Sequence, residues 1–204
     1  RGGKFMLNIG ILGLGTVGQG VVVILEKREE ELEKLLNKKV NIKKILVKDK
    51  NKKRDVKLAD GTLTDRFEDI LEDEEIQIVI EVTSTLEKGY EYIKKSMKKG
   101  KHIVSANKAI VSRYFEELTE LAQKKGIAFL YEASVAGGIP VLKALKEHMP
   151  LNEINEIQGI LNGTCNYILT RMIQEDLNYD EVLKEAQALG YAEADPAADR
   201  KSVV

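Results

Sequence analysis

The segment Leu7-Asn-Ile-Gly-Ile-Leu-Gly-Leu-Gly-Thr-Val-Gly18 decides the fold of this chain. Its apolar beginning is typical of a buried parallel strand, and the spacing from Thr16 to Leu36 indicates an amphipathic helix. Between them Gly13, Gly15 and Gly18 match G-x-G-x-x-G, whose glycines allow a tight turn, the approach of a pyrophosphate and close helix packing. The segment therefore predicts a dinucleotide-binding turn, the alternative being an ordinary glycine turn.

The sequence from the glycine motif to Tyr131 alternates strand-like and helical patterns. Such alternation implies a parallel sheet with helices on both faces, a Rossmann-type doubly wound α/β fold. Gly100 and Gly126 follow lysine-rich helix ends, where a left-handed glycine commonly closes a helix. The predicted strands are residues 7–14, 40–47, 76–82, 101–105 and 127–131, and the predicted helices are residues 16–36, 86–98 and 113–125.

The pattern changes after Tyr131, where we place a domain boundary. The following segments predict a helix from the Gly-Gly-Ile-Pro sequence to about Met149, a strand at residues 153–161, and helices at residues 164–175 and 179–189. We therefore expect a dinucleotide-binding domain at residues 6–131 and a second domain at residues 132–204. Met6 is the expected biological start, because residues 1–5 have no periodicity.

Composition excludes several classes of protein. Of the 204 residues, 43% are hydrophobic, as in a globular protein, and 32 basic residues nearly balance 33 acidic ones. That balance implies neither a nucleic-acid partner nor an acidic membrane surface. No apolar stretch is long enough to span a bilayer. A single cysteine, Cys165, excludes an internal disulfide, and without a signal-like segment it indicates a cytoplasmic protein.

The end of the second predicted strand carries the residues that would distinguish NAD from NADP. Asp49 is placed to accept a hydrogen bond from the 2′-hydroxyl of an adenosine ribose, as an acid does in NAD enzymes. Lys48 begins a basic cluster that continues to Arg54 and would instead hold the 2′-phosphate of NADP, unless it is simply a solvated loop. We favour NADP and keep NAD as the alternative. The predicted cofactor-binding residues of the glycine turn and of this strand end are Gly13, Gly15, Thr16, Val17, Gly18, Lys48 and Asp49.

Two further strand ends should lie at the same carboxyl edge of the sheet, where doubly wound folds bind ligands. Thr83 and Ser84 are expected on the nicotinamide side, although either hydroxyl would also cap the helix that begins near Leu86. Ser105 and Lys108 follow the next strand. A lysine there would polarise a carbonyl, hold a carboxylate or transfer a proton, although spacing alone favours an ordinary surface lysine.

Three downstream segments, together with Ala-Asn-Lys108, resemble the homoserine dehydrogenases. They read Tyr-Glu-Ala-Ser-Val-Ala-Gly-Gly-Ile-Pro (131–140), Gly-Ile-Leu-Asn-Gly-Thr-Cys-Asn-Tyr-Ile (159–168) and Gly-Tyr-Ala-Glu-Ala-Asp-Pro (190–196). The resemblance implies NAD(P)-dependent interconversion of L-homoserine and L-aspartate 4-semialdehyde in threonine, methionine and isoleucine biosynthesis. It also implies that residues 132–204 begin an α+β substrate and dimerisation domain, and that the full-length enzyme is a homodimer.

The resemblance assigns roles residue by residue. It makes Lys108 the catalytic lysine at cofactor and substrate, and it places Gly190 in the cofactor site. It makes Glu193 and Asp199 binding residues for the small-molecule substrate, whose ammonium group would form charge-assisted hydrogen bonds with carboxylates. A monovalent cation such as sodium would be held by Glu132, Val135, Gly137 and Ile139, mostly through backbone oxygens.

This sequence also departs from the family pattern. Thr83-Ser84 stands where many members have Gly-Gly, Val204 stands where a second substrate-side aspartate is expected, and the general acid/base lysine beyond it does not appear. We therefore expect little or no turnover from these 204 residues alone. The alternatives are a non-catalytic dinucleotide-binding module and, less in keeping with the downstream segments, another dehydrogenase of aspartate-derived substrates. Cys165, His102 and His148 are expected to be packing or surface residues and not nucleophiles or metal ligands.

Overall fold

A computed structural model describes residues 6–160 and 162–192 of the chain. The chain divides into two compact units, residues 1–134 and residues 135–204, which are described separately below. Among the described residues, no helix is both long enough and apolar enough to cross a membrane.

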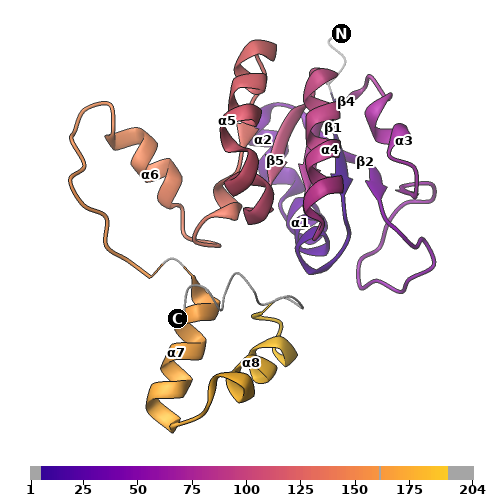
Figure 1. Cartoon of the computed structure of the whole chain (residues 1–204). Helices are drawn as coiled ribbons and strands as arrows, with labels where there is room; N and C mark the ends of the chain where they lie inside the picture. The colour runs from indigo at the N-terminus through magenta and orange to yellow at the C-terminus, as the bar shows by residue number, and fades with distance from the viewer. Residues whose placement is uncertain (1–5, 161, 193–204) are drawn as a thin grey trace. The chain divides into compact units, whose positions relative to one another are not determined.

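The first unit is built on a six-stranded sheet in which every paired strand is parallel (Figure 1). The strand order is β3-β2-β1-β4-β5-β6, the order of a dinucleotide-binding doubly wound fold. The predicted α/β fold is therefore confirmed. The strands are β1 (Met6–Leu12), β2 (Lys39–Leu46), β3 (Leu63–Thr64), β4 (Ile76–Glu81), β5 (His102–Ser105) and β6 (Phe129–Leu130).

Strand β1 lies at the centre of the sheet, between β2 and β4. The chain first adds β2 and β3 on one side of β1 and then crosses over to add β4, β5 and β6 on the other. The order therefore reverses between β1 and β4, and ligands of doubly wound folds bind outside the carboxyl ends of the strands at such a switch point.

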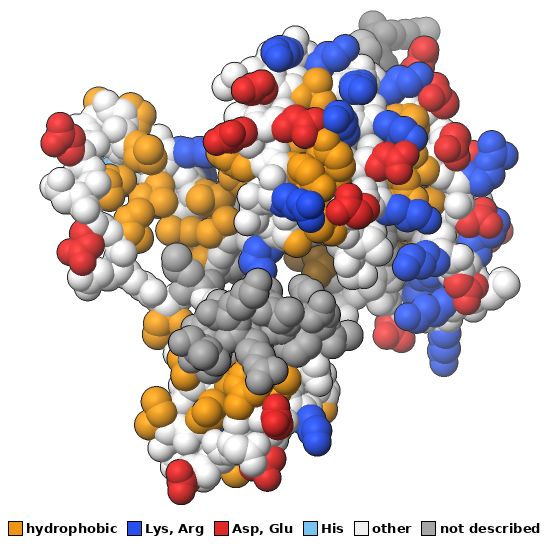
Figure 2. Space-filling view, viewed as in Figure 1, with side chains coloured by type: hydrophobic (Ala, Val, Ile, Leu, Met, Phe, Trp, Pro, Cys, Tyr) orange, Lys and Arg blue, Asp and Glu red, His pale blue; other side chains and the backbone are white. Residues whose placement is uncertain are grey.

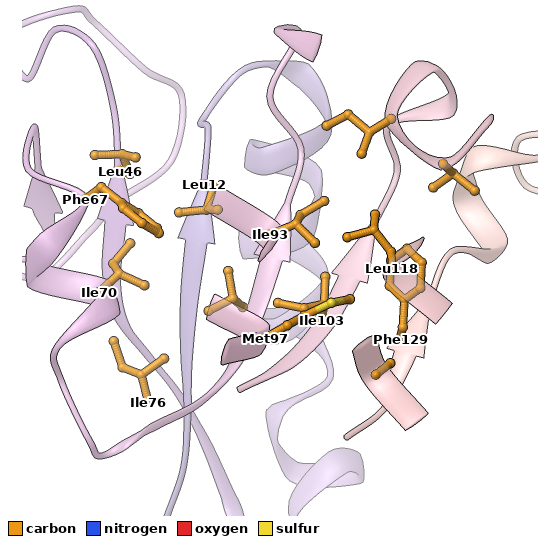
Figure 3. Close-up of a cluster of buried hydrophobic side chains, with 14 residues drawn as sticks. Leu12, Leu46, Phe67, Ile70, Ile76, Ile93, Met97, Ile103, Leu118 and Phe129 are labelled. Atoms are coloured by element: carbon orange, nitrogen blue, oxygen red, sulfur yellow. The ribbon is translucent and has the colours of Figure 1, made fainter. Parts of the chain in front are cut away.

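Alternating residues of the strands place their apolar side chains on opposite faces of the sheet. On β1, Ile9 and Ile11 join a core with Val22 of helix α1 (Thr16–Lys27), whereas Leu12 points to the opposite core. That second core contains Ile93 and side chains from three helices, α3 (Glu68–Leu71), α4 (Leu86–Lys98) and α5 (Lys108–Lys125). Figure 3 shows these side chains converging between the sheet and the helices. Both faces are covered, as the pattern predicted.

Two predicted helices begin or end elsewhere in the structure. The predicted helix at residues 16–36 is two helices, α1 and α2 (Glu29–Leu36), because the backbone leaves helical geometry at Arg28 and the bend lets α2 contact β2. Helix α5 begins at Lys108, five residues before the predicted start, because the side chain of Asn107 caps it by accepting a hydrogen bond from the Ile110 amide. Gly100 and Gly126 are left-handed, with φ of 80° and 63°, as predicted.

The second unit contains three helices in its described part: α6 (Val141–His148), α7 (Gly163–Glu175) and α8 (Tyr179–Ala188). Helices α7 and α8 contact each other through a small core of Ile168, Val182 and Ala186. The predicted strand at residues 153–161 is wrong for residues 153–160, which have no regular structure, and residue 161 lies outside the described residues. A strand needs a backbone partner, and no described segment of this unit supplies one.

A polar network also joins α7 to α8. Glu185 accepts hydrogen bonds from the hydroxyl of Tyr167 at 2.7 Å and from the guanidinium of Arg171 at 2.9 Å. The hydrogen bond from Tyr167, followed by that from Arg171, lowers the pKa of the Glu185 carboxyl below its usual value. Asn178 and Glu181 form a capping box at the start of α8. The hairpin thus has its own core and its own helix signals.

Many apolar side chains of the second unit are exposed (Figure 2). On the first unit, Figure 2 shows basic and acidic side chains interspersed, which agrees with the nearly balanced composition. The large exposed apolar residues of the second unit are Ile139, Met149, Leu151, Ile154, Ile157, Ile160, Leu169, Ile173, Leu189 and Tyr191.

Candidate functional site

The glycine turn after β1 is held between the neighbouring strand ends. The amide of Gly13 donates a hydrogen bond to the Leu46 carbonyl of β2 at 2.9 Å, and Val82 donates to the Leu12 carbonyl of β1 at 3.0 Å. Gly13 has a φ of 103°, and a Cβ atom there would lie 2.9 Å from the Val82 carbonyl oxygen. Gly18 is buried in α1, and a Cβ there would overlap the Gly13 carbonyl oxygen. Both positions therefore require glycine for the turn itself.

Gly15 differs from its two partners in the motif. It is exposed, its φ of −83° is ordinary, and no atom lies within 4 Å of a Cβ built on it. It forms the N-cap of α1 without a side-chain hydrogen bond to the first turn. Thr16 and Val17, both exposed, begin that turn. The space beside Gly15 and the unsatisfied amide groups of the helix N-terminus are what an anionic pyrophosphate needs.

The basic segment after β2 forms a loop that is organised by Arg54. Its guanidinium donates to the carbonyl of Asp49 at 2.6 Å and to the carbonyl of Lys52 at 2.7 Å. Lys50 pairs with Asp65, and one carboxylate oxygen of Asp49 accepts from the Asn51 amide at 2.8 Å.

Lys48, Lys52 and Lys53 are exposed in this loop, with no hydrogen bond or ion pair of their side chains found among the described residues. The loop follows β2, whose last residue, Leu46, bonds to the glycine turn. Arg54 and Lys50 therefore shape the loop, and these three lysines are its available cations.

The ends of β4 and β5 are joined by a buried acid that the sequence prediction missed, Glu81. Its side chain is fully buried, and its Oε1 accepts from the amide of Thr83 at 2.9 Å and from the Thr83 hydroxyl at 2.6 Å. Its Oε2 accepts from the hydroxyl of Ser105 at 2.7 Å. The sequence did contain a signal for this acid, because Glu81 stands in a run that is otherwise apolar enough to be a buried strand. A buried acid requires hydrogen-bond partners, so neighbouring polar residues could have been expected around it.

Two residues predicted to bind the cofactor, Thr83 and Ser105, belong to this hydrogen-bond network. Ser105 is buried and its hydroxyl is directed at Glu81, so it contributes to the edge by supporting other groups. Thr83 is half-buried, and Ser84 beside it is exposed. The alternative that Thr83 or Ser84 caps α4 is wrong, because the N-cap is Thr85, which makes no side-chain capping bond.

Lys108 is the first residue of α5 and lies directly after the carboxyl end of β5. Its side chain is exposed. The preceding residue, Asn107, fixes the backbone position of Lys108. The side-chain Nδ2 of Asn107 donates to the Thr83 carbonyl at 3.0 Å, and the Oδ1 of Asn107 caps the helix. The structure thus brings the glycine turn, Thr83 and Lys108 to one edge of the sheet.

Other predicted residues lie in the second unit or outside the described residues. Gly190 has a φ of 76° and follows α8, and Tyr191 beside it accepts a hydrogen bond from the Thr164 hydroxyl at 2.5 Å. Asn162 caps α7 by accepting a hydrogen bond from the Cys165 amide. The predicted substrate residues Glu193 and Asp199 lie outside the described residues.

The four residues predicted to bind a cation lie on both sides of the boundary between the two units. Glu132 begins a short 3₁₀ helix, η1 (Glu132–Ser134), in the first unit, and Val135, Gly137 and Ile139 belong to the second unit. Gly137 is left-handed and the carbonyl of Ile139 accepts a hydrogen bond from the Val141 amide at 2.8 Å. A left-handed turn, unlike a strand, turns its carbonyls away from a ladder, so backbone oxygens there suit a hard cation.

The cysteine and one histidine have the structural roles expected of them. Cys165 is buried without a disulfide, and the Nδ1 of His102 accepts a hydrogen bond from the Ala128 amide at 2.9 Å. Within residues 6–160 and 162–192, no three histidine, cysteine, aspartate or glutamate side chains gather as a metal site would require.

Comparison with known proteins agrees with this geometry and confirms the resemblance seen in the sequence. The family model described as "Homoserine dehydrogenase, NAD binding domain" matches residues 13–132, which is more than half of the chain. A second model, described as "Homoserine dehydrogenase", matches residues 140–203.

Relatives and solved structures agree with the family models. The chain is 46% identical to the homoserine dehydrogenase of Bacillus subtilis and 47% identical to that of Synechocystis sp., each over 193 residues and 95% of this chain. The alignments cover only 45% and 44% of those relatives, so the chain spans about half the length of the proteins it matches. A homoserine dehydrogenase structure from Thiobacillus denitrificans gives a TM-score of 0.86 at 42% identity, over 95% of this chain and 45% of that one. The chain therefore belongs to the homoserine dehydrogenase family.

Proposed function

We propose that the protein containing this sequence is an NAD(P)-dependent homoserine dehydrogenase. The observation that carries the proposal is the glycine turn at the switch point of the sheet, with open space beside Gly15 and the N-terminus of α1 behind it. An anionic dinucleotide is the ligand that fits such a turn. The reaction proposed is the interconversion of L-homoserine and L-aspartate 4-semialdehyde.

The residues of the carboxyl edge would divide the work. When bound, the nicotinamide cofactor supplies or accepts the hydride, and the protein positions the reacting carbon against it. Gly15, Thr16 and Val17 would hold the pyrophosphate through backbone amides. Thr83 would lie on the nicotinamide side, and Lys108 would stabilise or protonate the oxygen that develops charge. Glu193 and Asp199 are proposed to bind the ammonium group of the amino acid.

Cofactor binding and turnover together test this proposal. Titrating NADPH and NADH into the 204-residue protein, followed by cofactor fluorescence, should give saturable binding. Homoserine-dependent reduction of NADP⁺ should then appear in a protein of the relatives' full length that contains this sequence. Absence of dinucleotide binding would refute the proposal, and binding without turnover in the longer protein would favour a non-catalytic dinucleotide-binding module.

We further propose that NADP is the preferred cofactor, on the basis of Lys48, Lys52 and Lys53. The double variant Lys52→Gln/Lys53→Gln should raise the Kd of NADPH about 10-fold or more while changing that of NADH little, because a charge-assisted hydrogen bond contributes about 1.5–3 kcal/mol. Both constants can be measured by isothermal titration calorimetry. Lys38→Gln, before the amino end of β2, is the matched control. Equal losses for NADPH and NADH would contradict the assignment.

Two proposals concern the second unit. A homodimer is supported by its exposed large apolar side chains, which include Leu151, Ile157 and Ile173, because exposed apolar surface is a feature of interaction sites. A monovalent cation such as sodium, held by Glu132, Val135, Gly137 and Ile139, is supported by the left-handed turn. Light scattering on the full-length protein and the dependence of its activity on sodium concentration test the two proposals separately.

A further inference from the structure

Glu81 occupies an unusual position for an acidic side chain. It ends β4 at the switch point, its side chain is fully buried, and its three observed hydrogen-bond donors are uncharged. A buried carboxylate is expensive unless it is fully hydrogen-bonded, so an arrangement of this kind has to be specified closely by the residues around it. Here those residues are Thr83 and Ser105, both at the proposed cofactor edge.

The directions of these hydrogen bonds are determined by the atoms involved. Glu81 Oε1 accepts a hydrogen bond from the Thr83 amide, which can only donate. In the 2.6 Å contact with the same oxygen, the Thr83 hydroxyl is the donor. A hydroxyl has a single proton, and that of Thr83 is committed to Glu81. Towards a ligand, Thr83 Oγ1 therefore has only lone pairs to offer.

The backbone and side chain of Thr83 are closely packed by their surroundings. Asn107 holds the Thr83 carbonyl at 3.0 Å, and a Cβ atom on Gly89 of α4 would lie 2.9 Å from Thr83 Oγ1 and 3.1 Å from Glu81 Oε1. The helix thus packs directly against the pair. Among residues 6–160 and 162–192, the other hydrogen-bond contact to Thr83 Oγ1 comes from the Thr85 hydroxyl. It is 3.5 Å long and weak, so a lone pair remains for a stronger donor.

We propose that Glu81 is a positioning residue that makes Thr83 a hydrogen-bond acceptor for the carboxamide NH₂ of the nicotinamide ring. The proposal rests on the proposed cofactor site. A carboxamide has one face that donates and one that accepts, so a hydroxyl of fixed polarity recognises the donating face and sets the orientation of the group. The ring is thereby held in one of its two orientations about the glycosidic bond, and one face of it is presented to the substrate.

The 3-acetylpyridine analogue of NADPH tests this directly, because it replaces the carboxamide NH₂ with a methyl group that cannot donate. The measured quantity is the ratio of the Kd of the analogue to the Kd of NADPH, which general damage to the protein leaves unchanged. We expect a ratio of about 3 to 10 for the unmodified protein, the range of one neutral hydrogen bond. Thr83→Val, which keeps the shape and removes the hydroxyl, should bring the ratio close to about 1.

Matched variants separate the roles of Thr83 and Glu81. Thr83→Ser keeps the hydroxyl and should keep the ratio. Glu81→Gln can still accept both Thr83 donors through its amide oxygen and should also keep it, whereas Glu81→Met frees the Thr83 proton and should lower it. Thermal unfolding shows which variants are folded.

The outcomes distinguish failure of this inference about Thr83 and Glu81 from failure of the proposed function. An unchanged ratio in a folded, cofactor-binding Thr83→Val protein would overturn the inference about the carboxamide. An unchanged ratio in Glu81→Met with a lowered one in Thr83→Val would overturn the role of Glu81. Failure of the unmodified protein to bind either dinucleotide would instead refute the proposed function, and the cofactor titration alone reveals it.

Discussion

Gly18→Ala should destabilise the first unit by about 3 kcal/mol, the upper end of what overpacking costs, and should abolish dinucleotide binding with it. The added methyl group would overlap the carbonyl oxygen of Gly13, a backbone atom that cannot move without disturbing the whole turn. Gly13 is itself fixed by hydrogen bonding to β2. The strain therefore falls on the packing between α1 and β1, and it is present whether or not a ligand is bound.

Gly15→Ala should behave in the opposite way. No atom lies within 4 Å of the new Cβ, and the backbone at Gly15 suits an L-residue, so the free energy of unfolding should fall by no more than about 1 kcal/mol, the difference between glycine and alanine at an N-cap. The same methyl group would occupy the space proposed for the pyrophosphate. The Kd of NADPH should therefore rise about 10-fold or more, since an overpacked contact costs about 1–3 kcal/mol.

Urea unfolding and cofactor titration of both variants check the pair of predictions. Gly20→Ala is the matched control, because it lies in the same helix with open space around it, and it should raise stability by about 0.5–1 kcal/mol without changing affinity. If Gly15→Ala binds NADPH as tightly as the unmodified protein, the open side of the turn is not the pyrophosphate site. If Gly18→Ala is as stable as Gly20→Ala, the turn relaxes more easily than its packing indicates.

The contrast between these glycines shows why the sequence predicted the fold of the first unit so well. Local signals determined it: the apolar run into Gly13, the change to helical spacing at Thr16, and the glycines that end two lysine-rich helices all act within a few residues. The structure confirms the parallel sheet that these signals imply. Local signals were less informative for the start of α5, since the Asn107 cap lies ahead of the apolar periodicity.

The remaining errors concern interactions between distant residues. Glu81 is joined to Ser105 across two strands, and only the pairing of β4 with β5 brings them together, so sequence spacing did not reveal the cluster. The strand predicted at residues 153–161 has a suitable composition, but pairing depends on a partner that the pattern cannot supply. The sequence predicted the residues of the carboxyl edge one by one. The hydrogen bonds that decide which of them donate and which accept could be seen only in the folded structure.

Lys108→Ala should lower kcat about 10²- to 10⁴-fold in an active homoserine dehydrogenase that contains this sequence, the range typical of a general acid or base. The Kd of NADPH should change by less than about 10-fold, because we propose that the glycine turn supplies the main cofactor contacts. Lys108 is exposed at the first position of α5, and its backbone is fixed by the Asn107 cap, so alanine should leave the fold intact. Stopped-flow and steady-state rates of homoserine oxidation, with calorimetric NADPH binding, give both quantities.

Two further variants give this prediction its specificity. Lys124→Ala removes an exposed lysine from the last turn of the same helix, where its side chain is 76% exposed, and should leave kcat unchanged. Lys108→Arg keeps the positive charge but does not release a proton at ordinary pH. Recovery of most of the rate by arginine would mean that the charge polarises the carbonyl oxygen, whereas a loss as large as that of alanine would mean that Lys108 transfers the proton. Undiminished turnover in Lys108→Ala would remove this lysine from the reaction altogether and leave the chemistry to residues beyond the described part of the chain.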